Sequence, residues 1–392
     1  MVIKQIDIPM VMKDLYGDKV LYSSRPSYAF NPWLQPEEHQ SNLLSARELL
    51  IAKMPVVVHK ATVTEKTEVL FNTVGFEMPK GFRTYETREE YEQVLKSAVA
   101  NGEKVFFQYA HEESLVPGDQ YVVPRHKFLD LNNKSILDQW TKGKYLPKRE
   151  VVAIEAFESA VHAWTLPFVI KPGDEHPTAG GYGVMICYTE DDVAKAIERV
   201  RQAEGTRQMI IEQFIEPVQN YCVQYAYRKG GTPQFIGCSH QITEKYGKYR
   251  GNIIDLGIPQ DVIDVGLDIM KNGVEAGYIG IAGFDLLVDK EGDIYAIDLN
   301  FRQNGSSSLL LLDPVLNGPY KKFLAYYSEG DNEKFYETIL EEVKLGYLFP
   351  LAYYNGDYKE QNGFPSRFIC IWHGEESEVE TRVKAFEARL KG

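Results

Sequence analysis

The sequence predicts a mixed α/β fold, and three observations carry that prediction. Short runs of β-branched and apolar residues, such as MPVVVH at 54–59, are typical of buried strands. Amphipathic segments, such as residues 87–100, begin with a threonine and acidic side chains, as helices do. From about residue 208 onward, strand-like runs follow one another, which indicates antiparallel pairing. We therefore expect alternating strands and helices first and a larger antiparallel sheet after them.

Strand and helix alternate over about the first 125 residues, which predicts a separate α/β domain there. The expected strands are residues 19–23, 54–59, 104–109, 167–171, 183–188, 208–214, 220–228, 233–240, the hairpin 280–302, and 366–372. The expected helices are residues 37–53, 87–100, 132–150 (ending at Gly143), 150–163, 189–203 and 377–390. These elements divide the chain into three expected parts, at 1–128, 129–218 and 219–392.

The composition disfavours several classes of function. Lysine and arginine number 43 against 56 aspartate and glutamate residues, so the formal net charge is −13. Such a chain lacks the basic surface that nucleic acid requires, and anionic lipid would repel it. A few cations gathered in a cleft can still bind a small anion. We expect a cytoplasmic protein, because no signal peptide or membrane span is visible and the four cysteines are scattered.

A row of polar residues lies on the last strand of the predicted hairpin. Asp298, Asn300 and Arg302 are two residues apart, so strand periodicity places them on one face. If Glu291–Gly292 is a two-residue turn, Asp285 pairs directly with Asp298 across the ladder. Facing carboxylates repel unless a cation lies between them, and these oxygen ligands suit Mg²⁺ or Mn²⁺. An exposed polar sheet face is the alternative. The opposite, core face is expected to hold Tyr295, Ile297, Leu299 and Phe301.

Two lysines and a glycine-rich loop favour anion binding. Lys171 ends the buried strand PFVIK, where its ammonium group can meet a phosphate. Gly180, Gly181 and Gly183 follow in a loop whose backbone N–H groups can approach an anion closely. Lys134 begins a predicted helix. Each feature alone is also compatible with ordinary turn or surface residues, because the loop matches neither a Walker A motif nor GxGxxG.

The apolar strand at 209–217 ends in polar residues. Its backbone groups could meet a purine edge, and the carboxylate of Glu216 could hold a ribose hydroxyl. An ordinary core strand with a charged end explains the same pattern equally well.

Together these elements occur in the order and rough spacing of the ATP-grasp superfamily, which the chain resembles over about residues 130–312. The resemblance is strongest in IAGFDLLVDKEGDIYAIDLNFRQNGSSS, which begins at Ile281. It implies an ATP-grasp fold with a pre-grasp α/β domain at 1–128, a small nucleotide-binding subdomain at 129–218, and a large subdomain with a C-terminal extension at 219–392. The cofactors that it implies are ATP and Mg²⁺ or Mn²⁺.

The resemblance also implies roles for individual residues. Arg302 and Lys171 are the implied catalytic residues, and Asp285, Asp298 and Asn300 the implied metal ligands. The implied nucleotide contacts are Lys134, Lys171, Gly180, Gly181, Gly183, Glu212, Gln213, Ile215 and Glu216. The candidate substrate residues are Arg25, Arg302, Ser306 and Ser307.

The sequence departs from the family pattern in three places. Both acidic metal positions are aspartate, where glutamate is more common in the family. The insertion 174–178 brings Asp174 and Glu175 into the phosphate loop, where they would be unfavourable unless they turn outward. The residues after Arg302 lack the acidic and histidine side chains of biotin carboxylase, which disfavours bicarbonate chemistry.

The expected function is an ATP-dependent carboxylate ligase. It would activate the carboxylate of an amino acid or small peptide as an acyl phosphate and join it to an amine or to a carrier-protein thiol. The N-terminal region is similar to the pre-grasp domains of peptide and amide ligases in secondary metabolism, including the antibiotic pathways. The alternatives are a nucleotide-binding regulator without turnover and a biotin-carboxylase-like carboxylase.

The expected partners are a small amino-acid or peptide substrate and, for the thiol route, an acyl carrier protein. Carrier domains are acidic, so their docking needs a basic patch. Two clusters could supply one: Lys142, Lys144, Lys148 and Arg149, or Lys245, Lys248 and Arg250. Solvated loop charge is the alternative for each cluster. A homodimer is common in the family, but this sequence does not determine the oligomeric state.

Overall fold

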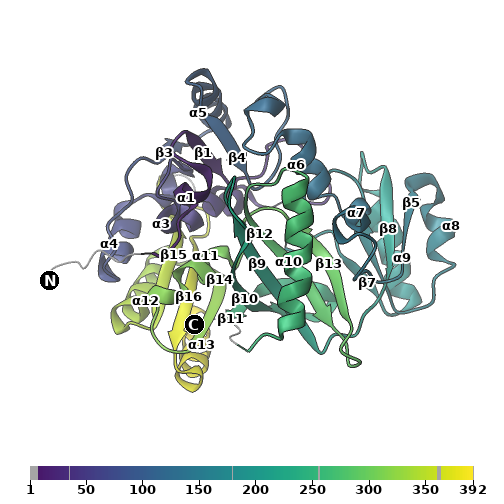
Figure 1. Ribbon diagram of the computed structural model, residues 1–392. Helices are drawn as coiled ribbons and strands as arrows, with labels where there is room; N and C mark the ends of the chain where they lie inside the picture. Colours follow the sequence, from purple (N-terminus) through teal and green to yellow (C-terminus); the bar gives the residue numbers. More distant parts are fainter. Residues whose placement is uncertain (1–7, 35, 179, 255–256, 360–362, 392) are drawn as a thin grey trace.

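The computed structural model describes residues 8–34, 36–178, 180–254, 257–359 and 363–391 (Figure 1). An eight-stranded antiparallel sheet forms the middle of the molecule. A separate four-stranded antiparallel sheet lies to the right of it in Figure 1, and two pairs of parallel strands belong to the region above it. Helices and strands are therefore mixed throughout, as the sequence predicts.

The N-terminal region contains the parallel strands. Strand β1 (Val20–Ser23) pairs with β4 (Lys104–Phe107), and β2 (Val57–His59) pairs with β3 (Arg83–Tyr85). The two pairs are joined because the Tyr22 backbone N–H donates to the Pro55 carbonyl at 2.9 Å. The helices around them are α1 (Met12–Tyr16), α2 (Glu38–Leu43), α3 (Leu49–Ala52), α4 (Glu65–Thr73), α5 (Arg88–Ala100) and α6 (Arg125–Leu131), with a 3₁₀ turn, η1 (Leu44–Glu48), between α2 and α3. The predicted helix at 37–53 is thus three short helical pieces.

The four-stranded sheet comes next along the chain. Its strand order is β5-β8-β6-β7, with bounds β5 (Arg149–Ala153), β6 (Phe168–Pro172), β7 (Met185–Cys187) and β8 (Gln208–Gln213). The helices of this region are α7 (Leu137–Thr141), α8 (Phe157–Val161) and α9 (Glu190–Arg201). The predicted helix at 150–163 is wrong in its first part, because residues 149–153 pair with β8 and only the later residues form a helix.

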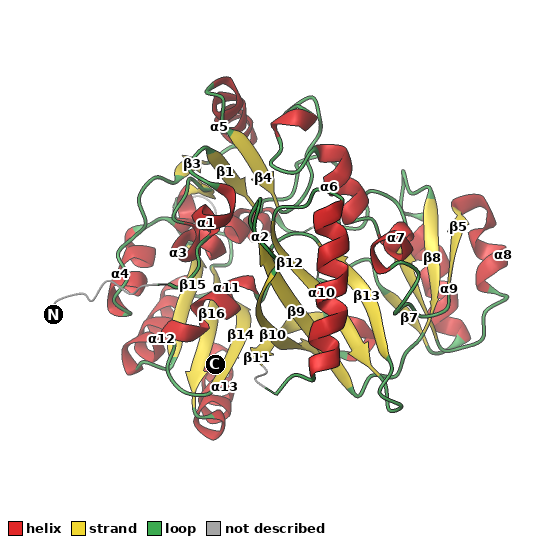
Figure 2. Cartoon of the chain, viewed as in Figure 1, coloured by secondary structure: helices red, strands yellow, loops and turns green. Residues whose placement is uncertain are grey.

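The eight-stranded sheet has the order β13-β12-β9-β10-β11-β14-β16-β15. Its strands are β9 (Gln219–Tyr227), β10 (Gln234–Thr243), β11 (Tyr249–Ile254), β12 (Gly280–Val288), β13 (Ile294–Asn300), β14 (Tyr320–Tyr327), β15 (Leu348–Tyr354) and β16 (Arg367–Gly374). Helix α10 (Gln260–Glu275) crosses the sheet beside β9 and β12 (Figure 2). The remaining helices are α11 (Ser307–Leu312), α12 (Asn332–Leu345) and α13 (Glu376–Lys391). Among the described residues, no helix is both long and apolar enough to cross a membrane.

The hairpin of β12 and β13 contains the expected metal residues. Asp285 pairs with Asp298, which confirms the predicted register at this point. The turn is different, however, because Val288 pairs with Ile294 and the loop has three residues, 290–292. The extra loop residue would shift the register by one, and an unpaired residue on β13, Ile297, shifts it back.

This bulge changes which side chains face the core. Ala296 is fully buried and packs in the same cluster as Leu299 and Phe301, with Ile294 beside it. Tyr295 and Ile297 are not members of that cluster, so their predicted place on the core face is wrong. An extra residue in a strand reverses the alternation of the side chains before it, and the sequence pattern alone does not show this.

Candidate active site

Lys134 is the first cation at the hairpin. It begins a 3₁₀ turn, η4 (Lys134–Ile136), which Asn133 caps by accepting a hydrogen bond from the Ser135 backbone N–H. Its Nζ donates to Asp298 Oδ1, and its side chain is only 9% exposed. Burial lowers the pKa of Lys134, because an ammonium group loses hydration there, and Asp298 opposes the shift. The structure therefore places Lys134 against the expected metal row.

Lys171 is the second cation, and it reaches the same hairpin from β6. Its Nζ donates to Glu212 Oε1 at 2.6 Å and to the Ile297 carbonyl at 3.0 Å. Ile297 is the bulged residue, which has no partner residue on β12. The bulge thus joins the four-stranded sheet to the eight-stranded sheet through a buried lysine.

Asp285 and Asp298 face each other across the hairpin. Asp285 is 8% exposed, and its Oδ1 has no hydrogen-bond partner within the described chain. Burial and the neighbouring Asp298 raise the pKa of Asp285 to about 7. Burial also acts to raise the pKa of Asp298, but Lys134 outweighs it and the net pKa is lowered. One carboxylate of the pair is therefore kept ionised, while the other titrates near neutral pH.

This donor set fits a hard divalent cation. The two carboxylates and the buried amide of Asn300 offer oxygen ligands, which Mg²⁺ prefers. The unpartnered Oδ1 of Asp285 is an acceptor that a cation would satisfy. Within the described residues, no group of three His, Cys, Asp or Glu side chains could hold a metal by itself. A cation here would therefore take its other ligands from a substrate or from water, as Mg²⁺ often does.

The raised pKa of Asp285 predicts a pH dependence of stability. Its carboxyl is protonated in the folded protein below about pH 7, whereas in the unfolded chain it ionises near pH 4. Its contribution to the free energy of unfolding is therefore full below about pH 4 and is lost as the pH rises toward 7. Thermal unfolding without metal, from pH 4 to 8, should show this fall for the wild type. The Asp285→Asn variant should show a smaller fall, and equal pH profiles would contradict the assignment.

Arg302 lies at the end of the row. Its Nη1 donates to Asn132 Oδ1 at 3.0 Å, and its Nη2 donates to the Thr178 carbonyl at 2.8 Å. Its guanidinium carbon is 5.5 Å from the centre of the Tyr109 ring. Arg302 as a whole is 6% exposed. It therefore joins the metal row, the glycine-rich loop and the N-terminal region, and Asn132 is a partner that the sequence pattern does not reveal.

The glycine-rich loop packs closely against a neighbouring turn. Gly180 and Gly181 have φ values of 60° and 75°, which favour glycine. A Cβ on Gly181 would lie 2.8 Å from the Gly247 carbonyl oxygen. Gly183 also needs to be small, because an added Cβ would lie 2.8 Å from a ring carbon of Pro172. These glycines thus allow the loop to pass close to Gly247 and to the Pro172 ring. Their predicted contact with phosphate stays a prediction.

The insertion before this loop does not turn outward as a pair. The Asp174 side chain is 8% exposed and accepts hydrogen bonds from the backbone N–H and from Nδ1 of His176. This hydrogen bond raises the pKa of His176. Glu175 is exposed. Only Glu175 therefore follows the expected outward orientation, and His176 holds the Asp174 carboxylate in place.

The predicted adenine and ribose positions lie at the end of β8. Glu212 is buried and uses its carboxylate for Lys171, and Ile215 is buried beyond it. Gln213 and Glu216 are exposed. The Gln213 backbone N–H already donates to the Lys148 carbonyl at 2.8 Å. A nucleotide contact at Gln213 therefore requires its carbonyl or its side chain.

Arg149 is the site residue that the sequence reasoning placed incorrectly. It was expected in a basic docking patch, but its side chain is only 12% exposed. The pairing of β5 with β8 sets Arg149 opposite Glu212, and its Nη2 donates to the Lys134 carbonyl. Its Nε and Nη1 have no hydrogen-bond partner in the part of the chain that the structure describes. Burial lowers its pKa. The sequence pattern predicts a helix from residue 150, whereas residues 149–153 form a strand that pairs with β8.

The candidate substrate residues fall into two groups. Ser306 and Ser307 are buried and bond to Gln224, whose Nε2 lies 2.7 Å from Ser306 Oγ and whose Oε1 lies 2.8 Å from Ser307 Oγ. Arg25 is part of a different cluster. Its Nε donates to Asn42 Oδ1 at 3.0 Å, and its guanidinium carbon is 3.3 Å from the centre of the Tyr28 ring. The structure does not bring Arg25 into contact with the metal row.

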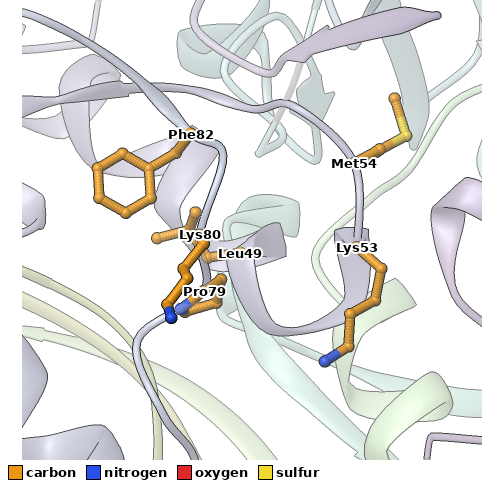
Figure 3. A pocket seen from close by; sticks show the side chains of 6 residues that line it. All are labelled: Leu49, Lys53, Met54, Pro79, Lys80 and Phe82. Atoms are coloured by element: carbon orange, nitrogen blue, oxygen red, sulfur yellow. The ribbon is translucent and has the colours of Figure 1, made fainter. Parts of the chain in front are cut away.

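A small surface pocket of about 160 Å³ lies in the N-terminal region (Figure 3). It contains Leu49, Lys53, Met54, Pro79, Lys80 and Phe82, and Figure 3 shows Lys53 and Lys80 on either side. Pockets for organic ligands usually have about 300–1,000 Å³. This pocket contains none of the predicted site residues. In the predicted site, Lys134 and Lys171 are engaged in ion pairs with Asp298 and Glu212.

Three family models match successive parts of the chain. The N-terminal domain model of L-aspartate–L-methionine ligase matches residues 11–129. The ATP-grasp model of the same family matches residues 147–300, and its C-terminal domain model matches residues 314–391. The matches follow the order of that family's domains and together cover most of the chain.

Solved structures share this fold at low sequence identity. An ADP complex of N5-carboxyaminoimidazole ribonucleotide synthetase has a TM-score of 0.60 at 11% identity, covering 99% of this chain and 100% of that one. An L-amino acid ligase from Bacillus licheniformis has a TM-score of 0.56 at 14% identity, covering 95% and 97%. Biotin carboxylase from Campylobacter jejuni has a TM-score of 0.56 at 14% identity, covering 95% and 91%. The arrangement of strands and the polar row at β13 agree with these family matches. The chain therefore belongs to the ATP-grasp ligases, as an ADP-forming carboxylate–amine ligase that uses ATP with Mg²⁺.

Proposed function

We propose that this enzyme joins L-aspartate to L-methionine through an acyl phosphate, with ATP converted to ADP. One observation carries the proposal: all three domain models of the L-aspartate–L-methionine ligase family match, in order, a chain that keeps the Asp285–Asp298–Asn300–Arg302 row. A family match restricted to the ATP-grasp part would support only a ligase of unknown substrate.

The proposed chemistry begins with binding of ATP phosphates by the buried cations. Lys134 and Lys171 supply two ammonium groups beside β13. Arg149 adds a guanidinium whose Nε and Nη1 have no hydrogen-bond partner among the described residues. Fixed cations in a water-poor site stabilise phosphate charge strongly, because they need no reorganisation during the reaction. The Lys134–Asp298 ion pair would open when the phosphates provide a new partner for Lys134.

Arg302 is proposed to act on the donor carboxylate. It lies at the end of the row, and hydrogen bonds to Asn132 and Thr178 hold its guanidinium in place. A carboxylate held there would face the terminal phosphate of ATP, so that alignment itself would lower the barrier. Mg²⁺ held by Asp285, Asp298 and Asn300 would neutralise phosphate charge. The reaction needs no covalent enzyme intermediate, so no nucleophilic side chain is required.

A carrier-protein thiol as the acceptor has weaker support. The basic cluster proposed for docking loses Arg149 to the interior, and Lys148 lies 5.4 Å from the Trp164 ring centre. The family matches concern an amino-acid acceptor. Charge-reversal variants of Lys142, Lys144 and Lys245 that left carrier acylation unchanged would remove the docking hypothesis entirely.

The test is ADP release by the purified enzyme with ATP, Mg²⁺ and amino acids singly and in pairs. L-Aspartate with L-methionine should give the highest rate and a dipeptide of the expected mass, and neither amino acid alone should give it. A higher rate with another pair would keep the ligase and overturn this substrate assignment. ATP binding without turnover in any mixture would instead favour the nucleotide-binding regulator.

A further inference from the structure

A second buried ion pair lies near Arg302 but outside the metal row. The 3₁₀ turn η1 (Leu44–Glu48) ends in Arg47 and Glu48, which are 5% and 0% exposed. Arg47 Nε donates to Glu48 Oε1 at 2.7 Å. Neither residue stands out in the sequence, because adjacent charges in a helical segment are usually on the surface. Both are instead enclosed between the N-terminal region and the eight-stranded sheet.

A short chain of contacts connects this pair to Arg302. Arg47 Nη2 donates to Gln108 Oε1 at 3.0 Å, and Gln108 Nε2 donates to the Tyr109 hydroxyl at 3.1 Å. The Arg302 guanidinium carbon lies 5.5 Å from the centre of the same Tyr109 ring. On the other side, Ser308 Oγ donates to the Arg47 carbonyl at 3.2 Å. The Gln108 amide and the Tyr109 ring therefore connect the ion pair to Arg302 at the end of the row.

The pair also lies where the fold favours a ligand. Ser24 follows β1 and donates to Glu48 Oε2 at 3.4 Å, and Gln108 follows β4 and bonds to Arg47. Ligands of α/β folds bind outside the carboxyl ends of parallel strands, and these are two such ends. A buried ion pair adds little to stability compared with apolar residues of the same volume, so stability alone is a weak explanation for it.

We propose that Arg47 and Glu48 bind the acceptor amino acid, an inference that rests on the proposed dipeptide function. Arg47 takes the α-carboxylate and Glu48 takes the α-amino group. The pair has no net charge, and neither has an amino-acid zwitterion, so the two are complementary. Without substrate, the Gln108 amide oxygen accepts a hydrogen bond from Arg47, as a carboxylate oxygen would. The α-carboxylate of the acceptor amino acid takes the place of this amide oxygen when it binds.

The position favours the acceptor over the donor. The carboxylate of the donor is converted to an acyl phosphate. It must therefore lie at the metal row, beside Arg302. The acceptor reacts through its amine and keeps its own carboxylate, which needs a cation elsewhere. Arg47, which is connected to Tyr109 through Gln108, supplies this cation. Burial raises the pKa of Glu48, although Arg47 opposes the shift, so the Glu48 carboxylate is poorly solvated and gains from a new polar partner.

The test compares L-methionine with L-methioninamide, which lacks the carboxylate. Wild-type enzyme should prefer the acid by about tenfold or more in kcat/KM, the effect of one charged hydrogen bond. In Arg47→Met this preference should fall toward unity, and in Arg47→Lys it should be partly kept. Glu48→Gln should raise KM for both acceptors. Hydroxamate formed from aspartate and hydroxylamine, which needs no acceptor carboxylate, should change little in Arg47→Met.

Glu342→Gln is the matched control. Glu342 is also buried and ion-paired, with Arg382 at 3.1 Å and Arg389 at 2.6 Å, but it lies on α12 in the C-terminal part. This variant should lower stability and keep the preference for the acid. A folded Arg47→Met that keeps the wild-type preference would overturn the inference, as would an equal loss of hydroxamate and dipeptide. If Arg47→Met does not fold, the inference is tested by two other measurements: the preference of Arg47→Lys for the acid over the amide, and the KM values of Glu48→Gln for both acceptors.

The failure of the proposed function would look different. In that case the wild type makes no aspartyl-methionine, and the acid and amide forms of whichever acceptor the amino-acid screen identifies are compared instead. Loss of that preference in Arg47→Met would still support Arg47 as the carboxylate partner.

Discussion

Asp298→Asn is expected to reduce ADP formation by about 10²–10³-fold or more, the loss seen when one group that stabilises a transition-state charge is removed. Asp298 is the only one of the two facing carboxylates whose pKa is lowered, so it supplies the permanent negative charge of the row. Asparagine keeps the shape and removes the charge. Both Mg²⁺ binding and the resting ion pair with Lys134 should therefore be lost.

Stability should change much less than activity in this variant. Asp298 is 27% exposed at its side chain, so Lys134 can reach water when its partner is lost. Asp293→Asn is the matched control, because it makes the same substitution on an exposed residue of the same hairpin. ADP release and thermal unfolding should be measured on both variants. Near-normal turnover in folded Asp298→Asn would remove the metal assignment, and equal losses in both variants would show that the hairpin itself is disturbed.

The pairing of the two aspartates shows how far the sequence reasoning reaches. A two-residue turn predicts this pairing, whereas the structure has a three-residue loop whose shift in register is cancelled at Ile297. The pairing was therefore correct although one of its premises was wrong. The core positions before the bulge were wrong for the same reason, since Ala296 replaces Ile297 on the inner face. Periodicity describes regular strands, and a bulge follows from packing and hydrogen bonding that neighbouring strands impose.

The contacts between elements could not be read from the sequence. The motif spacing favoured Lys134 and Lys171 as phosphate ligands, but not the bond from Lys171 to the Ile297 carbonyl. The position of Arg149 depends on β5 lying beside β8, which a local pattern does not indicate. Arg47 and Glu48 lack any motif, because their place follows from the packing of the N-terminal region on the large sheet. Local motifs therefore predict the polar row at the hairpin, whereas the residues that contact this row are determined by the tertiary fold.

Lys171→Met is expected to have a large effect on both stability and nucleotide binding. Lys171 and Glu212 are 7% and 3% exposed at their side chains and lie 2.6 Å apart. Removing Lys171 leaves the buried Glu212 carboxylate with only the more distant Arg149, whose Nε lies 3.8 Å from Glu212 Oε2. Breaking a buried ion pair in this way costs about 3–5 kcal/mol in the free energy of unfolding. The Ile297 carbonyl also loses its donor. Urea unfolding and ADP binding by calorimetry should both show the loss.

The double variant Lys171→Met/Glu212→Gln separates the two effects. A neutral glutamine removes the uncompensated carboxylate, so much of the lost stability should return, although Arg149 then loses its own neighbouring charge. Nucleotide affinity should stay low, because the ammonium group that would meet the phosphates is still absent. Recovery of ADP binding together with stability would show that Lys171 acts only through the fold. Recovery of stability alone would identify Lys171 as a phosphate ligand whose partner in the nucleotide-free enzyme is Glu212.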